Sequence, residues 1–274
     1  MPPEKRARGR PRAFNDQTDQ NTIKSLDRAV QVLETLATLQ SSTLSALASH
    51  MGESPATLYR VLITLQQRGI VDLDEAAQTW QIGAGAFLIG ASFLRRTALV
   101  DVARPTMRRL MEATGETANL GVERGDQVLF VSQVETHATI RAFFPPGSLS
   151  PLHASGIGKA LLSQWPPERL ARHLARTELT RFTPHTITTP EALRDNLTLI
   201  AQRGYSVDAE EKNIGMRCIA APVTDAMGET VAGISVSGPT SRMDVANLKT
   251  IAAHVTSAAR DLSRAMGARI EPAP

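Results

Sequence analysis

The residues with the most distinctive chemical spacing form a glycine-rich run at positions 153–160, His-Ala-Ser-Gly-Ile-Gly-Lys-Ala. The run suggests a phosphate loop, but the pattern GxxxxGK(S/T) requires glycine where His153 stands and serine or threonine where Ala160 stands. Nucleotide hydrolysis is therefore not expected. A helix that opens with Gly-Ile-Gly exposes unpaired backbone N–H groups at the positive end of its dipole, and such groups can hold a carboxylate.

A cysteine nucleophile and a metal site are the next chemistries to consider. The single cysteine, Cys218, has no partner for an internal disulfide and lies in an apolar stretch without a signature of activation. The six histidines include no HxH or HExxH pair, so no metal site and no cofactor are expected. The acidic run 208–211 is interpreted as a solvated loop.

Composition limits the kind of protein that can carry these residues. The chain has 274 residues, of which 42% are hydrophobic and 21% charged, so it is globular and long enough for two domains. No apolar stretch approaches the roughly 20 residues that span a bilayer. No secretory signal follows the basic start, so we expect a cytoplasmic protein without membrane contact.

The small net charge of +3 is concentrated at the N-terminus, where residues 1–22 are predicted to form a disordered basic arm. Within the arm, Arg8-Gly9-Arg10-Pro11-Arg12 has the composition of an AT-hook, whose arginines enter the narrow minor groove of A·T-rich DNA. Arg8, Arg10 and Arg12 are thus candidate DNA contacts. A solvated tail without groove specificity is the alternative.

Residues 23–83 follow the order of a winged helix-turn-helix domain. Apolar spacing predicts helices over 25–40 and 44–51, and Ser54-Pro55 begins a third helix that closes before Gly69. Alternating residues then predict a hairpin over 70–73 and 79–82. In this fold the third helix enters the DNA major groove, and its solvent face carries the candidate contacts Ser54, Ala56, Thr57, Tyr59, Arg60, Thr64 and Gln67.

A linker helix is predicted over 84–97, apolar on most sides, and it either dimerises or packs on the second domain. The sequence pattern over 98–270 then predicts a mixed α+β domain with antiparallel strands. The expected helices are 102–114, 156–163, 167–176, 190–203 and 244–266, and the expected strands are 119–122, 127–131, 139–143, 217–223 and 230–237.

Five long segments of the chain resemble the IclR family of bacterial transcriptional regulators. They are SLDRAVQVLE, SPATLYRVLITLQQRGIV, LHASGIGKALL, RGYSVDAEEKNIGMRCIAAPV and GISVSGPTSR. The resemblance covers 25–266 and is nearest to the branch that senses glyoxylate and pyruvate. It implies a winged helix-turn-helix domain, a linker helix and a GAF-like effector-binding domain. It also implies a homodimer, or a dimer of dimers, on palindromic double-stranded operator DNA.

The resemblance also implies an effector site for a small 2-oxo acid such as glyoxylate. The carboxylate would lie on the backbone N–H groups of Gly156 and Ile157, with a polar shell and one apolar wall residue. The shell is Asp208, Cys218, Ser235 and Ser237, and the wall residue is Met216. Thr139, Ala142 and Ser150 are smaller or more polar than the matching wall residues of the glyoxylate and pyruvate sensors, so a slightly larger or differently hydrated acid fits the pattern too.

Two classes of function follow from the sequence. The first is a DNA-binding regulator controlled by a 2-oxo acid, which is not an enzyme. The alternative is a small-molecule enzyme with an accessory N-terminal domain, using Cys218 and a histidine such as His153 on the same kind of acid.

Overall fold

A computed structural model describes residues 22–97 and 99–268, with the side chains of 91–97 excepted. The chain divides into two compact units, residues 1–93 and 94–274, so the division falls inside the predicted linker helix. Arg8, Arg10 and Arg12 of the predicted arm lie outside the described residues. None of the described helices has both the length and the apolar character needed to cross a membrane.

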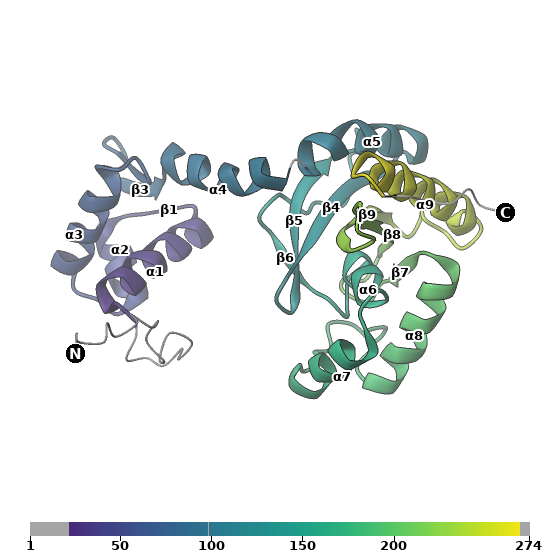
Figure 1. Cartoon of the computed structure of the whole chain (residues 1–274). Coiled ribbons are helices and arrows are strands. Elements are labelled where there is room, and N and C mark those ends of the chain that lie inside the picture. The colour runs from purple at the N-terminus through teal and green to yellow at the C-terminus, as the bar shows by residue number, and fades with distance from the viewer. Residues whose placement is uncertain (1–21, 98, 269–274) are drawn as a thin grey trace, which may run out of the picture. The chain divides into compact units, whose positions relative to one another are not determined.

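The first unit contains the three helices and the hairpin that the sequence predicts, with one additional short strand (Figure 1). In chain order its elements are α1 (Lys24–Leu39), β1 (Ser41–Ser42), α2 (Leu44–Met51), α3 (Pro55–Gln66), β2 (Val71–Asp74) and β3 (Thr79–Ile82), and α4 (Ala84–Thr97) follows as the predicted linker helix, with the division between the units inside it. The strand β1 was not predicted, because two serines carry no alternating pattern. It pairs with β3 and completes a three-stranded antiparallel sheet in the order β1-β3-β2.

Local sequence signals explain where these helices begin and end. The Thr43 hydroxyl accepts a hydrogen bond from the Ala46 N–H at the start of α2, and Gly52 ends that helix in the left-handed conformation. Ser54 caps α3 in the same way, with Pro55 in the first turn. A buried cluster holds the three helices and the hairpin together, and it consists of Val32, Leu36, Leu47, Ala48, Leu58, Leu62, Val71 and Trp80.

The second unit is an antiparallel sheet with helices on both faces. Its helices are α5 (Leu99–Thr114), α6 (Gly156–Leu162), α7 (Pro167–Arg176), α8 (Pro190–Arg203) and α9 (Leu248–Ala265), and its strands are β4 (Thr117–Arg124), β5 (Gln127–Val134), β6 (Leu149–Pro151), β7 (Ser206–Ala209), β8 (Met216–Thr224) and β9 (Thr230–Pro239). The strand order is β6-β5-β4-β9-β8-β7, with every neighbouring pair antiparallel. The predicted α+β class is thereby confirmed.

The sheet separates two hydrophobic cores. Figure 1 shows α5 and α9 on one face, where they pack on residues such as Ile219, Ile234 and Val236. The other face carries α6, α7 and α8, which pack around residues such as Phe130 and Ala220. Because side chains alternate along a strand, each central strand contributes to both faces.

Three sequence-based assignments are corrected by the structure. Residues 139–143 do not form a strand; the Arg242 side chain bonds the Ile140 carbonyl, and β6 follows the Pro145-Pro146-Gly147 turn instead. The final helix begins at Leu248, four residues later than predicted. The acidic run 208–211 is not a solvated loop, because Asp208 lies in β7 and Glu211 is buried.

Candidate functional site

The solvent face of α3 is the first candidate site. Ser54, Ala56, Tyr59, Arg60, Thr64 and Gln67 are exposed, and Thr57 is half-buried. Two hydroxyls are committed to the helix cap, since Ser54 Oγ donates to Thr57 Oγ1 at 2.8 Å and accepts from the Thr57 N–H. The Thr64 hydroxyl donates to the Arg60 carbonyl at 2.7 Å. Tyr59, Arg60 and Gln67 therefore keep the side-chain groups with which α3 can contact a nucleic acid.

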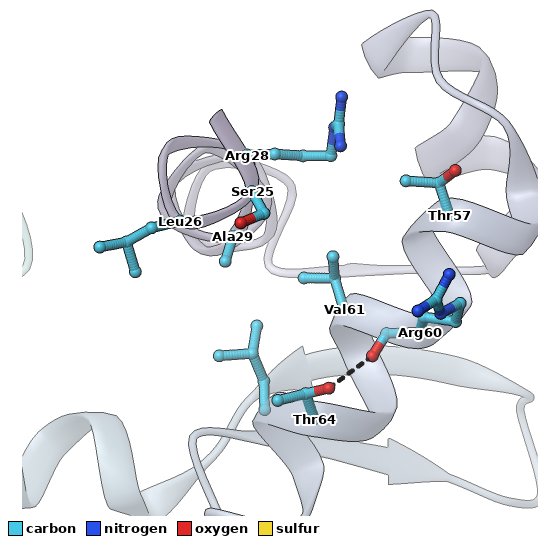
Figure 2. A pocket seen from close by; sticks show the side chains of 9 residues that line it. Ser25, Leu26, Arg28, Ala29, Thr57, Arg60, Val61 and Thr64 are labelled. Carbon is cyan, nitrogen blue, oxygen red and sulfur yellow. Dashed lines mark hydrogen bonds between the residues drawn. The ribbon is translucent and has the colours of Figure 1, made fainter. Parts of the chain in front are cut away.

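A groove of about 470 Å³ runs between α3 and the start of α1. Figure 2 shows Val61 on the side of α3 nearest Ala29, with Arg60 and Thr64 along the same helix. The groove has an apolar floor and a polar rim, and its lining residues are Ser25, Leu26, Arg28, Ala29, Thr57, Arg60, Val61, Thr64 and Leu65. Arg28 on the rim is paired with Glu53 at 2.7 Å, whereas Arg60 remains exposed to solvent.

The second candidate site is a cavity of about 20 Å³ in the second unit, between the sheet and α6. Strand register brings its polar residues into one row, because Cys218 lies opposite Asp208 on one side and opposite Ser237 on the other. Ser235 lies two residues from Ser237, on the same face of β9. The cavity volume of about 20 Å³ is far below the hundreds of Å³ of a drug-sized site, so the cavity suits a ligand of a few atoms.

Most residues expected at the effector site do line this cavity: Gly156, Ile157, Asp208, Cys218, Ser235 and Ser237. Met216 does not, because it stands at the first position of β8, paired with Pro239, beyond the edge of the cavity. Of the three departures noted above, Ser150 lines the cavity whereas Thr139 and Ala142 do not.

Sequence reasoning missed part of the wall. Phe130 and Phe144 stack with ring centroids 4.9 Å apart and form its apolar side. Lys212 also lines the cavity, with Ala154 and Ser155. Phe144 and Lys212 come from segments without regular secondary structure, so no periodicity in the sequence indicated them.

One hydroxyl in the cavity makes no well-formed hydrogen bond to the described residues. Ser235 is fully buried, and the only described side chain close enough to interact with its Oγ is the weakly bonding Cys218 thiol. The neighbouring Ser237 Oγ, by contrast, accepts from Asn119 Nδ2 at 3.2 Å. Because buried polar groups are nearly always hydrogen-bonded, a hydroxyl on a cavity without a well-formed hydrogen bond indicates a group that a ligand or water satisfies.

Gly156 is required for the space in this cavity. A Cβ at that position would lie 2.6 Å from Cys218 Sγ and 3.5 Å from the Ala220 Cβ. The next turn of α6 is fixed by Ser155, whose hydroxyl accepts from the Gly158 N–H. The first N–H groups of a helix have no partner within it, so those of Gly156 and Ile157 are available to a ligand.

Burial controls the electrostatics of the cavity. It raises the pKa of Asp208 to about 6, helped by the charge of Glu211 and opposed by the Glu211 N–H, which donates to Asp208 Oδ1 at 2.7 Å. Behind the cavity, the fully buried Lys159 ammonium donates to a Glu211 carboxylate oxygen and, at 2.7 Å, to the Val207 carbonyl. Burial also raises the pKa of Glu211, although Lys159 acts in the opposite direction.

The same environment disfavours nucleophilic chemistry. Burial and the Asp208 charge raise the pKa of the Cys218 thiol to about 11, so the thiolate is scarce at neutral pH. His153, the histidine of the enzymatic alternative, does not line the cavity; its Nε2 lies 3.0 Å from the Thr180 carbonyl. The described residues include no group of three His, Cys, Asp or Glu side chains that could hold a metal ion.

A winged helix-turn-helix joined to a separate domain with a small polar cavity defines a DNA-binding transcriptional regulator. Comparison with known proteins gives the family: residues 25–75 match the IclR helix-turn-helix domain, and residues 91–264 match the bacterial transcriptional regulator IclR C-terminal family. The chain belongs to the IclR family of bacterial transcriptional regulators.

Relatives match this chain over nearly its whole length. It is 52% identical to the HTH-type transcriptional regulator BhcR of Paracoccus denitrificans, with 96% of each chain covered. It is 36% identical to the HTH-type transcriptional repressor AllR of Escherichia coli, over 98% of this chain and 99% of the relative. The crystal structure of the Thermotoga maritima IclR gives a TM-score of 0.77 at 28% identity, covering 90% of this chain and 100% of that one. These relatives are regulators, so the prediction of a non-enzyme is confirmed and the enzymatic alternative is wrong.

Replacing Tyr59 and Arg60 together with alanine is expected to weaken operator binding by at least about tenfold, because both side chains project from the exposed face of α3. The salt dependence of binding should also become shallower by about one phosphate contact. Mobility-shift titrations at several salt concentrations measure both effects. Arg172→Ala, which removes an exposed charge from the second unit, is the matched control. Unchanged affinity and sequence preference in the double variant would exclude α3 as the reading helix.

Proposed function

We propose that this chain regulates transcription by binding a palindromic operator with an affinity that a small 2-oxo acid, such as glyoxylate, controls. The acid binds in the cavity between the sheet and α6. Its carboxylate accepts hydrogen bonds from the backbone N–H groups of Gly156 and Ile157. Asp208, Cys218, Ser235 and Ser237 surround the remaining oxygen atoms.

The observation that carries this proposal is the buried Ser235 hydroxyl, which makes no well-formed hydrogen bond to the described residues and has only the Cys218 thiol beside it. This hydroxyl lies on a cavity whose other polar groups can bond to oxygen atoms, and the cavity volume limits the ligand to a few atoms. The resemblance to glyoxylate and pyruvate sensors supports the same class of acid. Ser150 adds a hydroxyl to the wall, which favours a hydrated form of the acid.

The proposal includes a homodimer, or a dimer of dimers, because a palindromic operator presents two equivalent half-sites. Exposed apolar side chains support it: Phe87, Leu88 and Ile89 of α4 are 72%, 62% and 62% exposed. Ile23, Leu26 and Val30 at the start of α1 are also exposed. Exposed apolar side chains close together on one helix favour an interface between copies of the chain.

A mobility-shift titration on the DNA upstream of the protein's own gene tests the proposal, at stated salt, with and without glyoxylate, pyruvate and glycolate. The acid must bind the two DNA-affinity states unequally, so one acid alone is expected to change operator affinity. Operator binding that none of these acids alters would overturn the effector assignment and leave the regulator class standing.

Effector binding is expected to weaken as the pH rises. The effector brings a second negative charge next to Asp208, so it favours the protonated carboxyl, whose pKa is about 6 before binding. Above pH 6 each complex must take up a proton, and affinity should fall by up to about tenfold per pH unit. The other charged or titratable groups facing Asp208 are Glu211, Lys159, Lys212 and Cys218.

Calorimetric titrations of glyoxylate between about pH 6 and pH 8 measure this slope. The Asp208→Asn variant, which cannot titrate, is the control and should show a much flatter profile. A slope that persists in Asp208→Asn would assign the proton to another group.

A further inference from the structure

Lys212 lies at the cavity on the loop that joins β7 to β8, and its ammonium group forms no ion pair with a carboxylate of the described residues, although the charge of the nearby Asp208 acts to raise its pKa, which burial lowers. Its Nζ is 3.4 Å from the centre of the Phe182 ring, a cation–π contact. None of the ion pairs among the described residues includes Lys212. The other lysine nearby, Lys159, is already committed to Glu211 and to the Val207 carbonyl.

The loop that carries Lys212 is held in one conformation by side-chain hydrogen bonds. The Thr183 hydroxyl donates to the Glu210 carbonyl at 2.7 Å, and the Thr186 hydroxyl donates to the Glu211 carbonyl at 2.6 Å. Glu210 itself has a positive φ of 65°, a conformation that a non-glycine residue adopts only when its surroundings hold it there. The backbone of Lys212 is therefore positioned before any ligand arrives.

The charge balance of the cavity requires a cation when an acid enters. The described residues that line the cavity include one carboxylate, Asp208, and one cation, Lys212. A carboxylate transferred from water into such a site is strongly disfavoured unless it is paired and hydrogen-bonded. The long, flexible lysine side chain can leave the Phe182 ring and reach the ligand without any movement of its backbone.

We propose that Lys212 is a specificity-determining residue of the effector site: its ammonium group pairs with the effector carboxylate and makes the cavity selective for acids. This inference rests on the proposed function, because it names the group that recognises the same effector. The Phe182 ring holds the ammonium group at the cavity in the absence of an acid. Burial lowers the pKa of Lys212, and the negative charge of a carboxylate ligand would oppose this effect, as the charge of Asp208 already does.

Calorimetric titration of the full-length chain with glyoxylate and with pyruvate tests the role of Lys212. Lys212→Gln and Lys212→Met, which both remove the charge, are expected to bind the acid at least about tenfold more weakly than the unmodified protein. Lys212→Arg keeps the charge and should recover most of that loss. Lys249→Gln, which removes an exposed lysine charge on α9, should bind within about twofold of the unmodified protein.

The outcomes separate the inference from the proposed function. If the unmodified protein binds neither acid, the effector class fails and the role of Lys212 fails with it. If the unmodified protein binds an acid and both charge-removing variants bind it equally well, only the role of Lys212 is overturned. If Lys249→Gln loses as much affinity for the acid as the Lys212 variants do, the role of Lys212 is also overturned, because the loss would then reflect the net charge of the protein. Thermal unfolding of each variant checks that the fold is intact. Because two variants remove the charge, the test still works if either Lys212→Gln or Lys212→Met fails to fold.

Discussion

Replacing Lys159 with methionine is expected to lower the free energy of unfolding of the second unit by about 3–5 kcal/mol. Lys159 is fully buried in α6, and its ammonium group bonds to Glu211 and to the Val207 carbonyl. Methionine preserves the length of the side chain but leaves the buried Glu211 carboxylate without its counter-charge. One Glu211 oxygen, Oε2, has no hydrogen-bond partner in the described structure, so the variant would leave the carboxylate with only the Ala209 backbone N–H beside it.

The chain offers a clean way to measure this loss. Its two tryptophans are Trp80 in the first unit and Trp165 in the second, so a Trp80→Phe background makes Trp165 fluorescence report the second unit alone. Urea titrations in that background compare Lys159→Met with a double variant that also carries Glu211→Gln. The double variant should recover more than half of the loss, because both charges are then absent. If the two variants have the same free energy of unfolding, the loss of stability in Lys159→Met comes from packing and not from the ion pair.

The second large effect is expected at Gly156. Gly156→Ala should abolish the effect of the acid on operator binding, because the new methyl group would enter the cavity 2.6 Å from Cys218 Sγ. The backbone itself tolerates alanine, since Gly156 is not among the residues with positive φ. The variant should therefore fold, and its operator binding without the acid provides the check.

A compensating substitution makes the Gly156 test specific. Adding Cys218→Ala removes the sulfur atom that the methyl group would meet, so the double variant should regain part of the response to the acid in the same mobility-shift titration. Retention of the full response in Gly156→Ala alone would show that the ligand binds elsewhere. Failure of the double variant to regain any response would point to the lost thiol as a necessary contact.

Local signals in the sequence were sufficient for the DNA-binding unit. Ser54-Pro55 predicted the start of α3, and Gly52 predicted the end of α2, because caps depend on one or two residues and their immediate neighbours. The short strand β1 could not be predicted in this way. Its two serines form a strand only because β3, some forty residues later, offers a free edge.

The cavity between the sheet and α6 is formed by pairing between strands that are distant in the sequence, so it was harder to predict. The polar residues that line it were found through a resemblance to known regulators, and the register of β7, β8 and β9 explains why they meet. Met216 does not line the cavity, because it lies two residues before Cys218, at the first position of β8, where its strand partner is Pro239. Lys212 and Phe144 were missed because loops position them through contacts distant in sequence. The prediction of a solvated loop over 208–211 is wrong, because a run of acidic residues does not indicate that one of them, Glu211, pairs with the buried Lys159.

Strand β9 has two sides with different neighbours, and this has a mechanical consequence. Ser235 and Ser237 face the cavity, while Ile234 and Val236, between and beside them, belong to the core beneath α5 and α9. Because consecutive side chains share one backbone, any movement of β9 at Ser235 would also move Ile234 and Val236, which pack in the core beneath α5 and α9. Helix α5 begins at Leu99, two residues after the linker helix α4 ends. A movement of β9 would therefore reach the helix that follows the linker in the chain.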